Sequence, residues 1–214
     1  MESKSYERDD LTVEYIPARC IHAAECARGL PAVFDPERRP WIDPERADAD
    51  AIAEVVRRCP TGALRYRRKD GGPGEMPDAE TTLRVAPDGP ILVRGAIRLR
   101  LPDGETVEDT RVALCRCGRS SRKPWCDNSH VQAGFRDPGA LADGRMKPAD
   151  GTEDAGVELW TTANGPLFLK GRVTLEGADG RSVEGAGTAL CRCGESARKP
   201  FCDGTHKRIG FEAD

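Results

Sequence analysis

The sequence predicts an α+β protein with a small N-terminal domain, followed by two repeated, mainly-β units that pack as a pseudo-symmetric pair. Three observations support this prediction. In the N-terminal part of the chain, apolar residues repeat first with the period of a strand and then with the period of a helix. The segment from residue 89 to residue 135 then recurs 76 positions later without a gap. Finally, nine cysteines fall into three groups of three, so each unit has its own group.

The N-terminal domain, residues 8–69, is expected to contain two strands and a helix. Alternating apolar residues predict a strand over Leu11–Tyr15, and Leu64–Arg67 is expected to be a short returning strand. Between them, apolar residues at i, i+3, i+4 and i+7 predict an amphipathic helix over residues 47–59. Pro60 follows and helps to end this helix.

A linker rich in glycine and proline, residues 70–80, leads to the repeats at 81–136 and 157–214, which an irregular loop at 137–156 connects. Hairpin-turn dipeptides separate the alternating apolar runs of both copies: Asp88-Gly89, Asp103-Gly104, Asn164-Gly165 and Asp179-Gly180. Each copy is therefore expected to form about three short strands that lead to a cysteine-rich loop. Two copies are too few for a solenoid, so we expect a monomer with an internal pseudo-two-fold axis.

Composition excludes several classes of function. The net charge is −3 without a basic block, so there is no electrostatic case for binding nucleic acid. Charged residues reach 32%, and no apolar run approaches the length of a membrane span. The N-terminus is charged and has no apolar segment, so we expect no signal peptide and a cytoplasmic protein. Aromatic residues make up only 5%, which predicts a weak hydrophobic core and stabilisation by bound metal.

The cysteines are expected to bind metal, because an odd number without an export signal argues against a disulfide framework. Two of the three groups are followed, four residues later, by a histidine. These two sets are Cys115, Cys117, Cys126 and His130, and Cys191, Cys193, Cys202 and His206. On ligand chemistry alone, three thiolates and one imidazole suit a structural zinc ion or an iron–sulfur cluster equally well.

Both stretches resemble the CDGSH iron–sulfur (NEET) family, whose pattern is C-x-C-x₂-(S/T)-x₃-P-x-C-D-G-(S/A/T)-H. The resemblance covers roughly residues 83–135 and 159–211. The matching residues include Ser120, Pro124, Cys126, Asp127 and His130 in the first copy, and Ser196, Pro200, Cys202, Asp203, Gly204, Thr205 and His206 in the second. Asn128 departs from the pattern, because the family has glycine there. If the position needs a left-handed backbone, asparagine is the least costly alternative, so we expect the site to survive.

The resemblance implies one [2Fe–2S] cluster in each repeat. One iron would be held by Cys115 and Cys117 and the other by Cys126 and His130. The second copy would use its equivalent residues, Cys191, Cys193, Cys202 and His206. Beside these ligands, Asp127 and Asp203 are expected to orient them or to cap a short helix. Lys123 and Lys199 are expected to donate hydrogen bonds or to present positive charge to a partner.

The third group of cysteines lies in the N-terminal domain. The run Cys20-Ile21-His22-Ala23-Ala24-Glu25-Cys26, followed later by Cys59-Pro60, resembles a divergent single-cluster bacterial ferredoxin over roughly residues 10–67. Ala23 stands where the middle cysteine of such a ferredoxin would be. The resemblance implies a [3Fe–4S] cluster on Cys20, Cys26 and Cys59. The competing expectation is a [4Fe–4S] cluster with water, a carboxylate or His22 on the fourth iron. The other expectations for His22 are a hydrogen bond near the cluster and a plain surface histidine.

These assignments predict a redox protein that is not an enzyme, because no nucleophile set remains once the metal ligands are assigned. We expect single-electron transfer between a redox donor and an acceptor through three clusters. The alternatives are a protein that stores clusters or transfers them to apo iron–sulfur proteins, and a sensor of redox state or pH. A zinc-structured interaction module is the remaining alternative. No partner among nucleic acids or membranes is expected.

Overall fold

The computed structural model describes residues 1–144, 146–149 and 156–213. The chain divides into two compact units, Met1–Met76 and Pro77–Asp214. Across the described residues the protein mixes helix and strand, and strand predominates. None of the helices described has both the length and the apolar character that crossing a membrane requires.

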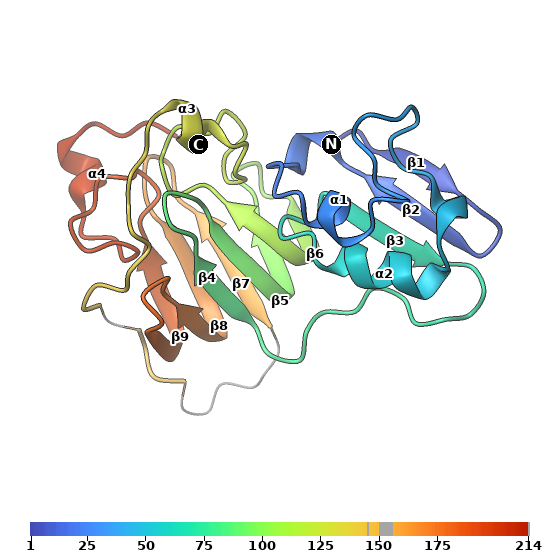
Figure 1. Ribbon diagram of the computed structural model, residues 1–214. Helices are drawn as coiled ribbons and strands as arrows, with labels where there is room; N and C mark the ends of the chain where they lie inside the picture. The colour runs from blue at the N-terminus through green and yellow to red at the C-terminus, as the bar shows by residue number, and fades with distance from the viewer. Residues whose placement is uncertain (145, 150–155, 214) are drawn as a thin grey trace. The chain divides into compact units, whose positions relative to one another are not determined.

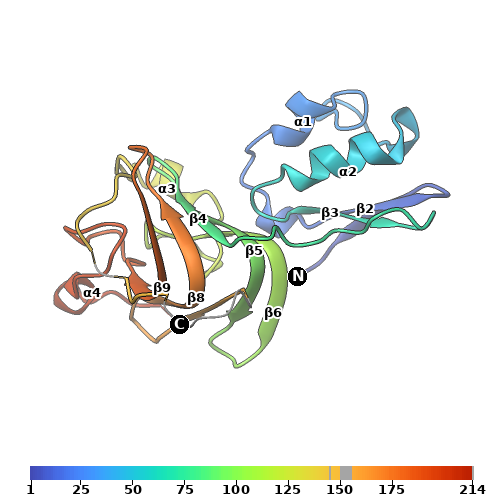
Figure 2. The ribbon, with the colours of Figure 1, turned by 90° about the horizontal axis from the view of Figure 1, so that it is seen from below.

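The first unit is a three-stranded antiparallel sheet covered on one face by helix (Figures 1 and 2). The strands, in spatial order, are β1 (Lys4–Glu7), β2 (Leu11–Tyr15) and β3 (Leu64–Arg68). The helices are α1 (Glu25–Gly29) and α2 (Ala49–Arg57), with short 3₁₀ turns at Pro17–Arg19 and Pro44–Arg46. The predicted strands and the predicted helix are therefore confirmed. Strand β1 was not predicted, because its residues Lys-Ser-Tyr-Glu lie on an exposed edge and carry no alternating pattern.

Helix α2 begins and packs as its sequence dictates. The Asp48 carboxylate accepts a hydrogen bond from the Ala51 N–H at 2.8 Å, which satisfies a free donor of the first turn. The apolar face of the helix is buried through Ile52, Val55 and Val56. These side chains belong to the same hydrophobic core as Leu11 and Val13 of β2, so the helix packs against the sheet.

The second unit is a six-stranded sheet to which both repeats contribute three strands. The first copy supplies β4 (Thr82–Val85), β5 (Ile91–Arg100) and β6 (Thr106–Leu114), and the second supplies β7 (Val157–Thr161), β8 (Leu167–Glu176) and β9 (Ser182–Leu190). All four predicted turn dipeptides lie between antiparallel neighbours, so the hairpins are confirmed. Two short helices, α3 (Ser129–Gln132) and α4 (Thr205–Arg208), follow the cysteine-rich loops.

Strands of the two copies are interleaved rather than segregated. Strand β4 pairs with β5 of its own copy and, in parallel, with β8 of the other. Likewise β7 pairs with β8 of its own copy and, in parallel, with β5. Figure 2 shows the β5–β6 and β8–β9 hairpins on opposite sides of β4. The two long strands change partner near Gly95 and Gly171, which have positive φ angles of 128° and 120° and lie at register shifts.

The expectation of a weak core was wrong for this unit. Its interior is a continuous set of fully buried aliphatic side chains, among them Leu83, Ile91, Leu99, Leu159 and Leu175. The low aromatic content misled the prediction, because valine, leucine and isoleucine fill the interior instead. The predicted irregular loop at 137–156 includes residues 145 and 150–155, which lie outside the described residues; its other residues contain no helix or strand longer than a single bridge.

Candidate iron–sulfur centres

The eight CDGSH-type donors come together in pairs. In the first copy, the Cys115 and Cys117 sulfurs lie 3.8 Å apart, and the Cys126 sulfur lies 3.4 Å from His130 Nδ1. The equivalent pairs in the second copy have the same separations: Cys191 with Cys193 at 3.8 Å, and Cys202 with His206 Nδ1 at 3.4 Å. Within the described part of the chain, no three His, Cys, Asp or Glu side chains converge on a single ion position.

Strand ends and a short helix position these pairs. Strand β6 ends at Leu114, directly before Cys115, and an isolated bridge between Leu114 and Trp125 returns the chain to Cys126. The second copy repeats this bridge between Leu190 and Phe201. His130 then lies in α3, one residue after its start, so the helix aims the imidazole back at Cys126.

The turn before each helix has a left-handed backbone. Asn128 has φ 73° and its counterpart Gly204 has φ 85°. The structure therefore supports the expectation that asparagine substitutes for the family's glycine at this position. In this conformation each residue also donates its backbone N–H to the preceding cysteine sulfur, at 3.5 Å from Asn128 to Cys126 and 3.4 Å from Gly204 to Cys202.

The electrostatics of the ligand loops act on the thiols and on the imidazole in different ways. Burial raises the pKa of Cys126 to about 11, while the N–H donated by Asn128 opposes this shift by favouring the thiolate. The Arg119 N–H points at the Cys117 sulfur in the same way, at 3.4 Å. Burial, followed by the nearby Arg116 charge, lowers the pKa of His130, so the ring is held in the neutral form that can bind a metal.

The predicted aspartates connect the two halves of each ligand loop. Asp127 accepts hydrogen bonds from the Ser121 N–H at 2.8 Å and the Ser129 N–H at 3.1 Å. Burial alone would raise the pKa of Asp127, but the hydrogen bonds from Ser129 and Ser121 outweigh it and hold the pKa well below its usual range. Asp203 does the same in the second copy, accepting from the Ala197 and Thr205 N–H groups at 2.9 Å each.

The predicted lysines also have defined partners. Lys123 donates to the Ser120 carbonyl oxygen at 2.6 Å, and Lys199 donates to the Ser196 carbonyl oxygen at the same distance. Lys199 additionally lies 3.6 Å from an oxygen of Asp137, a residue of the first copy. The two lysines therefore brace their own loops, and Lys199 also connects the two copies.

Sequence reasoning missed the arginine between the first two cysteines of each motif. Arg116 is 1% exposed, donates to the Gly89 and Ala86 carbonyl oxygens at 2.9 and 2.7 Å, and is paired with Asp137. Its guanidinium lies over the Phe135 ring, 5.0 Å from the centroid. Arg192 makes the equivalent contacts with the Gly165 carbonyl oxygen and the Phe211 ring. The recurrence of C-R-C, Gly-Pro and Gly-Phe in both copies was the signal that could have identified it.

The N-terminal cysteines surround one small apolar cavity. Its lining includes Cys20, Cys26 and Cys59 together with Ala23, the residue at the vacant ferredoxin position. Sequence reasoning missed two further lining residues. Burial, followed by the interaction with Cys20, raises the pKa of the Tyr15 phenol. The Thr61 hydroxyl lies 3.6 Å from the Cys59 sulfur.

His22 and Glu25, the side chains that could provide a fourth ligand to the N-terminal cluster, differ in their position relative to this cavity. His22 is exposed and is not among the residues that line this cavity, whereas Glu25 lines it. The Glu25 carboxylate accepts a hydrogen bond from Arg28 at 2.8 Å. Of the two candidates, Glu25, the first residue of α1, is therefore the one that contributes to the lining of this cavity.

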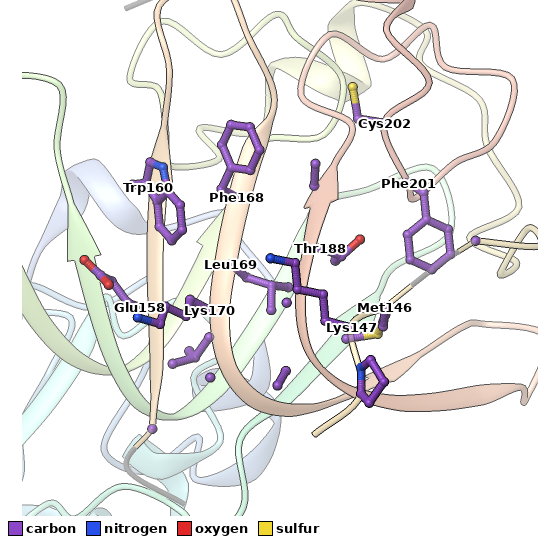
Figure 3. Close-up of a pocket in the computed structure, with 18 of the residues that line it drawn as sticks. Met146, Lys147, Glu158, Trp160, Phe168, Leu169, Lys170, Thr188, Phe201 and Cys202 are labelled. Atoms are coloured by element: carbon purple, nitrogen blue, oxygen red, sulfur yellow. The ribbon is translucent and has the colours of Figure 1, made fainter. Parts of the chain in front are cut away.

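A large groove of about 1280 Å³ runs beside the second CDGSH centre (Figure 3). Cys202 lines one end of it, next to Phe201. The Trp160 and Phe168 rings are stacked, with centroids 5.5 Å apart. The charged residues of the lining are Arg98, Lys147, Glu158, Lys170 and Arg198, so cations predominate.

Comparison with known proteins agrees with this architecture. The family model described as "Divergent 4Fe-4S mono-cluster" matches residues 6–69. The model described as "Iron-binding zinc finger CDGSH type" matches twice, at 88–131 and 164–207. A 66-residue stretch is 36% identical to the uncharacterized protein YjdI of Escherichia coli K12, covering 31% of this chain and 87% of the relative. The YjdI protein of Escherichia coli O157:H7 matches equally well. The chain therefore belongs to the CDGSH-type iron–sulfur proteins, with two tandem CDGSH domains joined to a divergent 4Fe–4S mono-cluster domain.

Proposed function

We propose that this iron–sulfur protein transfers single electrons through three clusters: a [2Fe–2S] cluster in each CDGSH domain and one cluster in the N-terminal domain. The observation that supports the CDGSH assignment is the division of each donor set into two pairs at the same separations in both copies. Each iron of a [2Fe–2S] cluster takes two protein ligands, whereas a zinc ion needs all four donors around one point.

The chain's own residues supply the conditions for such centres. A bound [2Fe–2S] cluster would accept and release one electron, and replacing a thiolate by neutral imidazole raises its potential. Backbone N–H groups of Arg119, Asn128 and Gly204 point at ligand sulfurs and stabilise negative charge there. Burial of Cys115 and Cys117 excludes water from one side of the first centre. Because the cysteines and histidines of both CDGSH motifs are assigned as metal ligands, we propose no enzymatic reaction.

For the N-terminal domain we propose a [3Fe–4S] cluster on Cys20, Cys26 and Cys59. The support is that Cys20, Cys26, Cys59 and Ala23 line the same cavity. A [4Fe–4S] cluster with Glu25 as the fourth ligand is the form that competes with it.

Iron and acid-labile sulfide per chain, with EPR of the oxidised and reduced protein, test the cluster assignments together. The proposal requires two irons and two sulfides from each CDGSH domain, plus about three irons from the N-terminal domain. Ala23→Cys should add a fourth iron there and abolish the EPR signal of an oxidised three-iron centre. Zinc in place of iron, without sulfide or visible colour, would contradict the proposal.

Cluster transfer is a second candidate, which the second copy favours. Cys202 is partly exposed and lines the open groove, whereas its counterpart Cys126 is buried. A centre at Cys202 and His206 is therefore the more accessible to an apo-protein. Incubating the holo-protein with an apo-ferredoxin tests this: rapid loss of two irons, slowed in the His206→Cys variant, supports transfer, and retention of all iron supports electron relay.

The groove also indicates the kind of redox partner. Because Lys147, Lys170 and Arg198 outnumber Glu158 in the groove that Cys202 lines, we propose that an acidic redox protein docks in this groove. The rate of electron exchange with reduced acidic ferredoxin should fall with salt and fall at least tenfold in a Lys147→Glu, Lys170→Glu variant. Lys4→Glu, an exposed lysine of the N-terminal domain, is the control and should change the rate little. Equal rates in both variants would contradict this docking site.

We further propose that the two repeats form a pseudo-two-fold pair within a monomer. The support is the equivalence of their cross-pairings, since β4 and β7 each bridge β5 and β8. Sedimentation of the full chain at several concentrations tests the monomer, and a mass that doubles with concentration would contradict it.

A further inference from the structure

The cysteine loops of the two CDGSH copies are in direct backbone contact. A Cβ atom placed on Gly118 would lie 2.6 Å from the carbonyl oxygen of Cys193. Reciprocally, a Cβ atom placed on Gly194 would lie 2.8 Å from the carbonyl oxygen of Cys117. Real Cβ atoms do not come so close, so only glycine allows this approach. Each glycine directly follows a ligand cysteine of its own copy and touches a ligand cysteine of the other.

A buried ionic bridge also joins the two sites. One carboxylate, that of Asp137, is paired with Arg116, accepts a hydrogen bond from the Gly139 N–H at 2.9 Å and lies 3.6 Å from Lys199. Arg116 separates Cys115 from Cys117, and Lys199 belongs to the ligand loop of the second copy. Arg116 is 1% exposed and Asp137 is 8% exposed, so this half of the bridge is shielded from solvent, while the Lys199 side chain is 20% exposed.

From these two contacts we propose that the CDGSH sites act as a coupled pair, in which the state of one centre changes the reduction potential of the other. This inference rests on the proposed occupancy of both sites by [2Fe–2S] clusters. One electron accepted by a centre from an external one-electron donor converts one Fe(III) to Fe(II) and adds one negative charge. Cys117 and Cys193, at the contact between the loops, are 6% and 8% exposed, so this charge is poorly screened there and opposes the addition of a second electron at the neighbouring centre.

The first test compares full-length holo-protein with two single-centre variants. Cys202→Ala with His206→Ala empties the second site, and Cys126→Ala with His130→Ala empties the first. Each protein is titrated anaerobically with dithionite and followed by EPR and visible absorption. If the centres are coupled, the second wild-type reduction step lies below both single-centre potentials. If the two single-centre potentials reproduce the two wild-type steps, the inference is wrong.

Iron and sulfide assays on the same samples distinguish independent reduction potentials from a failure of the proposed function. Absence of clusters from the wild-type protein would overturn the proposed function, whereas clusters with independent potentials would overturn the coupling alone. A measurement on the unaltered protein guards against variants that do not fold. The EPR line of the CDGSH centres should broaden between half and full reduction, because each reduced centre then has a paramagnetic neighbour, and an unchanged line shape contradicts the close approach of the centres on which the coupling depends.

The second test asks whether a glycine of one loop acts on the other loop's centre. In protein whose first site has been emptied, Gly118→Ala should still shift the potential of the second centre or accelerate its loss of iron, because the new methyl group meets Cys193. Gly134→Ala is the matched control: Gly134 also has a positive φ, 61°, but a Cβ atom there meets nothing within 4 Å. Equal effects of the two substitutions would show only backbone strain and would contradict the inference.

The third test concerns the ionic bridge. Asp137→Asn removes the negative charge between Arg116 and Lys199, so both CDGSH potentials should rise together. Asp143→Asn is the control, because the side chain of Asp143 is fully exposed. A shift confined to the first centre would show that Asp137 serves only its own copy and would contradict the bridge.

Discussion

Asn128 shows how a single backbone conformation decides whether a ligand loop can form. It has the left-handed φ that Gly204 has in the second copy, and its side chain makes no capping hydrogen bond with the helix. Asparagine adopts this region at a lower cost than alanine, although Ala24 of this chain also has a left-handed φ, 60°. Asn128→Ala should therefore lower the unfolding free energy by about 1 kcal/mol and speed loss of the first cluster, while Asn128→Gly should do neither.

Urea denaturation followed by circular dichroism, together with the decay of visible absorption, measures both effects. Gly204→Asn is the reciprocal variant, and it should be tolerated as well as Asn128 is in the first copy. Tolerance of alanine at position 128 would contradict the role assigned to the left-handed backbone.

Arg116 matters because it is buried with its charge compensated. Its guanidinium connects the Gly89 and Ala86 carbonyl oxygens to Asp137. Arg116→Ala would leave the Asp137 carboxylate buried with a major partner removed, which typically costs about 3–5 kcal/mol. The same urea denaturation should show a loss of this size, whereas Arg136→Ala, whose side chain is 81% exposed, should change stability by less than about 0.5 kcal/mol. Equal losses would contradict the argument.

At the scale of elements, the turn between β4 and β5 has a counterpart that serves as a comparison. Asp88 (φ 48°) accepts a hydrogen bond from the Asp137 N–H at 2.7 Å, and Asn164 (φ 54°) accepts one from the Ala213 N–H at the same distance. The same turn is thus made once with a charge and once without. The backbone N–H of Asp137, followed by the charge of Arg136, lowers the pKa of Asp88.

A lowered pKa means that this carboxylate stabilises the fold above its unfolded pKa of about 3.9. That contribution is lost as the pH falls through the folded value. Asp88→Asn should therefore keep the hairpin but be less stable than wild type at pH 7, and the difference should shrink as the pH is lowered from 5 to 3. Midpoints of urea denaturation across this range measure it, and a difference that is constant with pH would contradict the assignment.

The hairpins and the interleaving of strands differ in how far sequence could predict them. Each hairpin is a local event, since a turn dipeptide and the alternating residues beside it specify both strands, and these were predicted. The parallel pairing of β4 with β8 and of β5 with β7 depends on residues far apart in the chain. Gly95 and Gly171, where the long strands change partner, were noticed only as members of the repeat. The sequence around these glycines does not indicate which strand pairs with the long strand after the bulge.

At the scale of the whole molecule, the ligand sets were accessible from the sequence because spacing and recurrence report them directly. The contact of Gly118 with Cys193 was not, because it depends on how the two copies meet. The same holds for Glu25, which contributes to the lining of the N-terminal cavity while His22 remains exposed. Ligand identity is therefore a local property of this chain, and the environment of each ligand is a property of its tertiary structure.

The division into two compact units has a consequence for stability. The core of the first unit contains Ile52, Val55 and Leu11, and the core of the second contains Leu83 and Leu159; the two cores share no residue. We therefore expect Ile52→Ala, which removes a fully buried side chain, to destabilise the first unit by about 2–5 kcal/mol and to release its cluster. The CDGSH centres should keep their iron, since their ligands and core lie in the second unit. Calorimetry combined with EPR checks this: one transition should move to lower temperature while the CDGSH signals persist. If both transitions move, or if all iron is lost together, the units are not energetically independent.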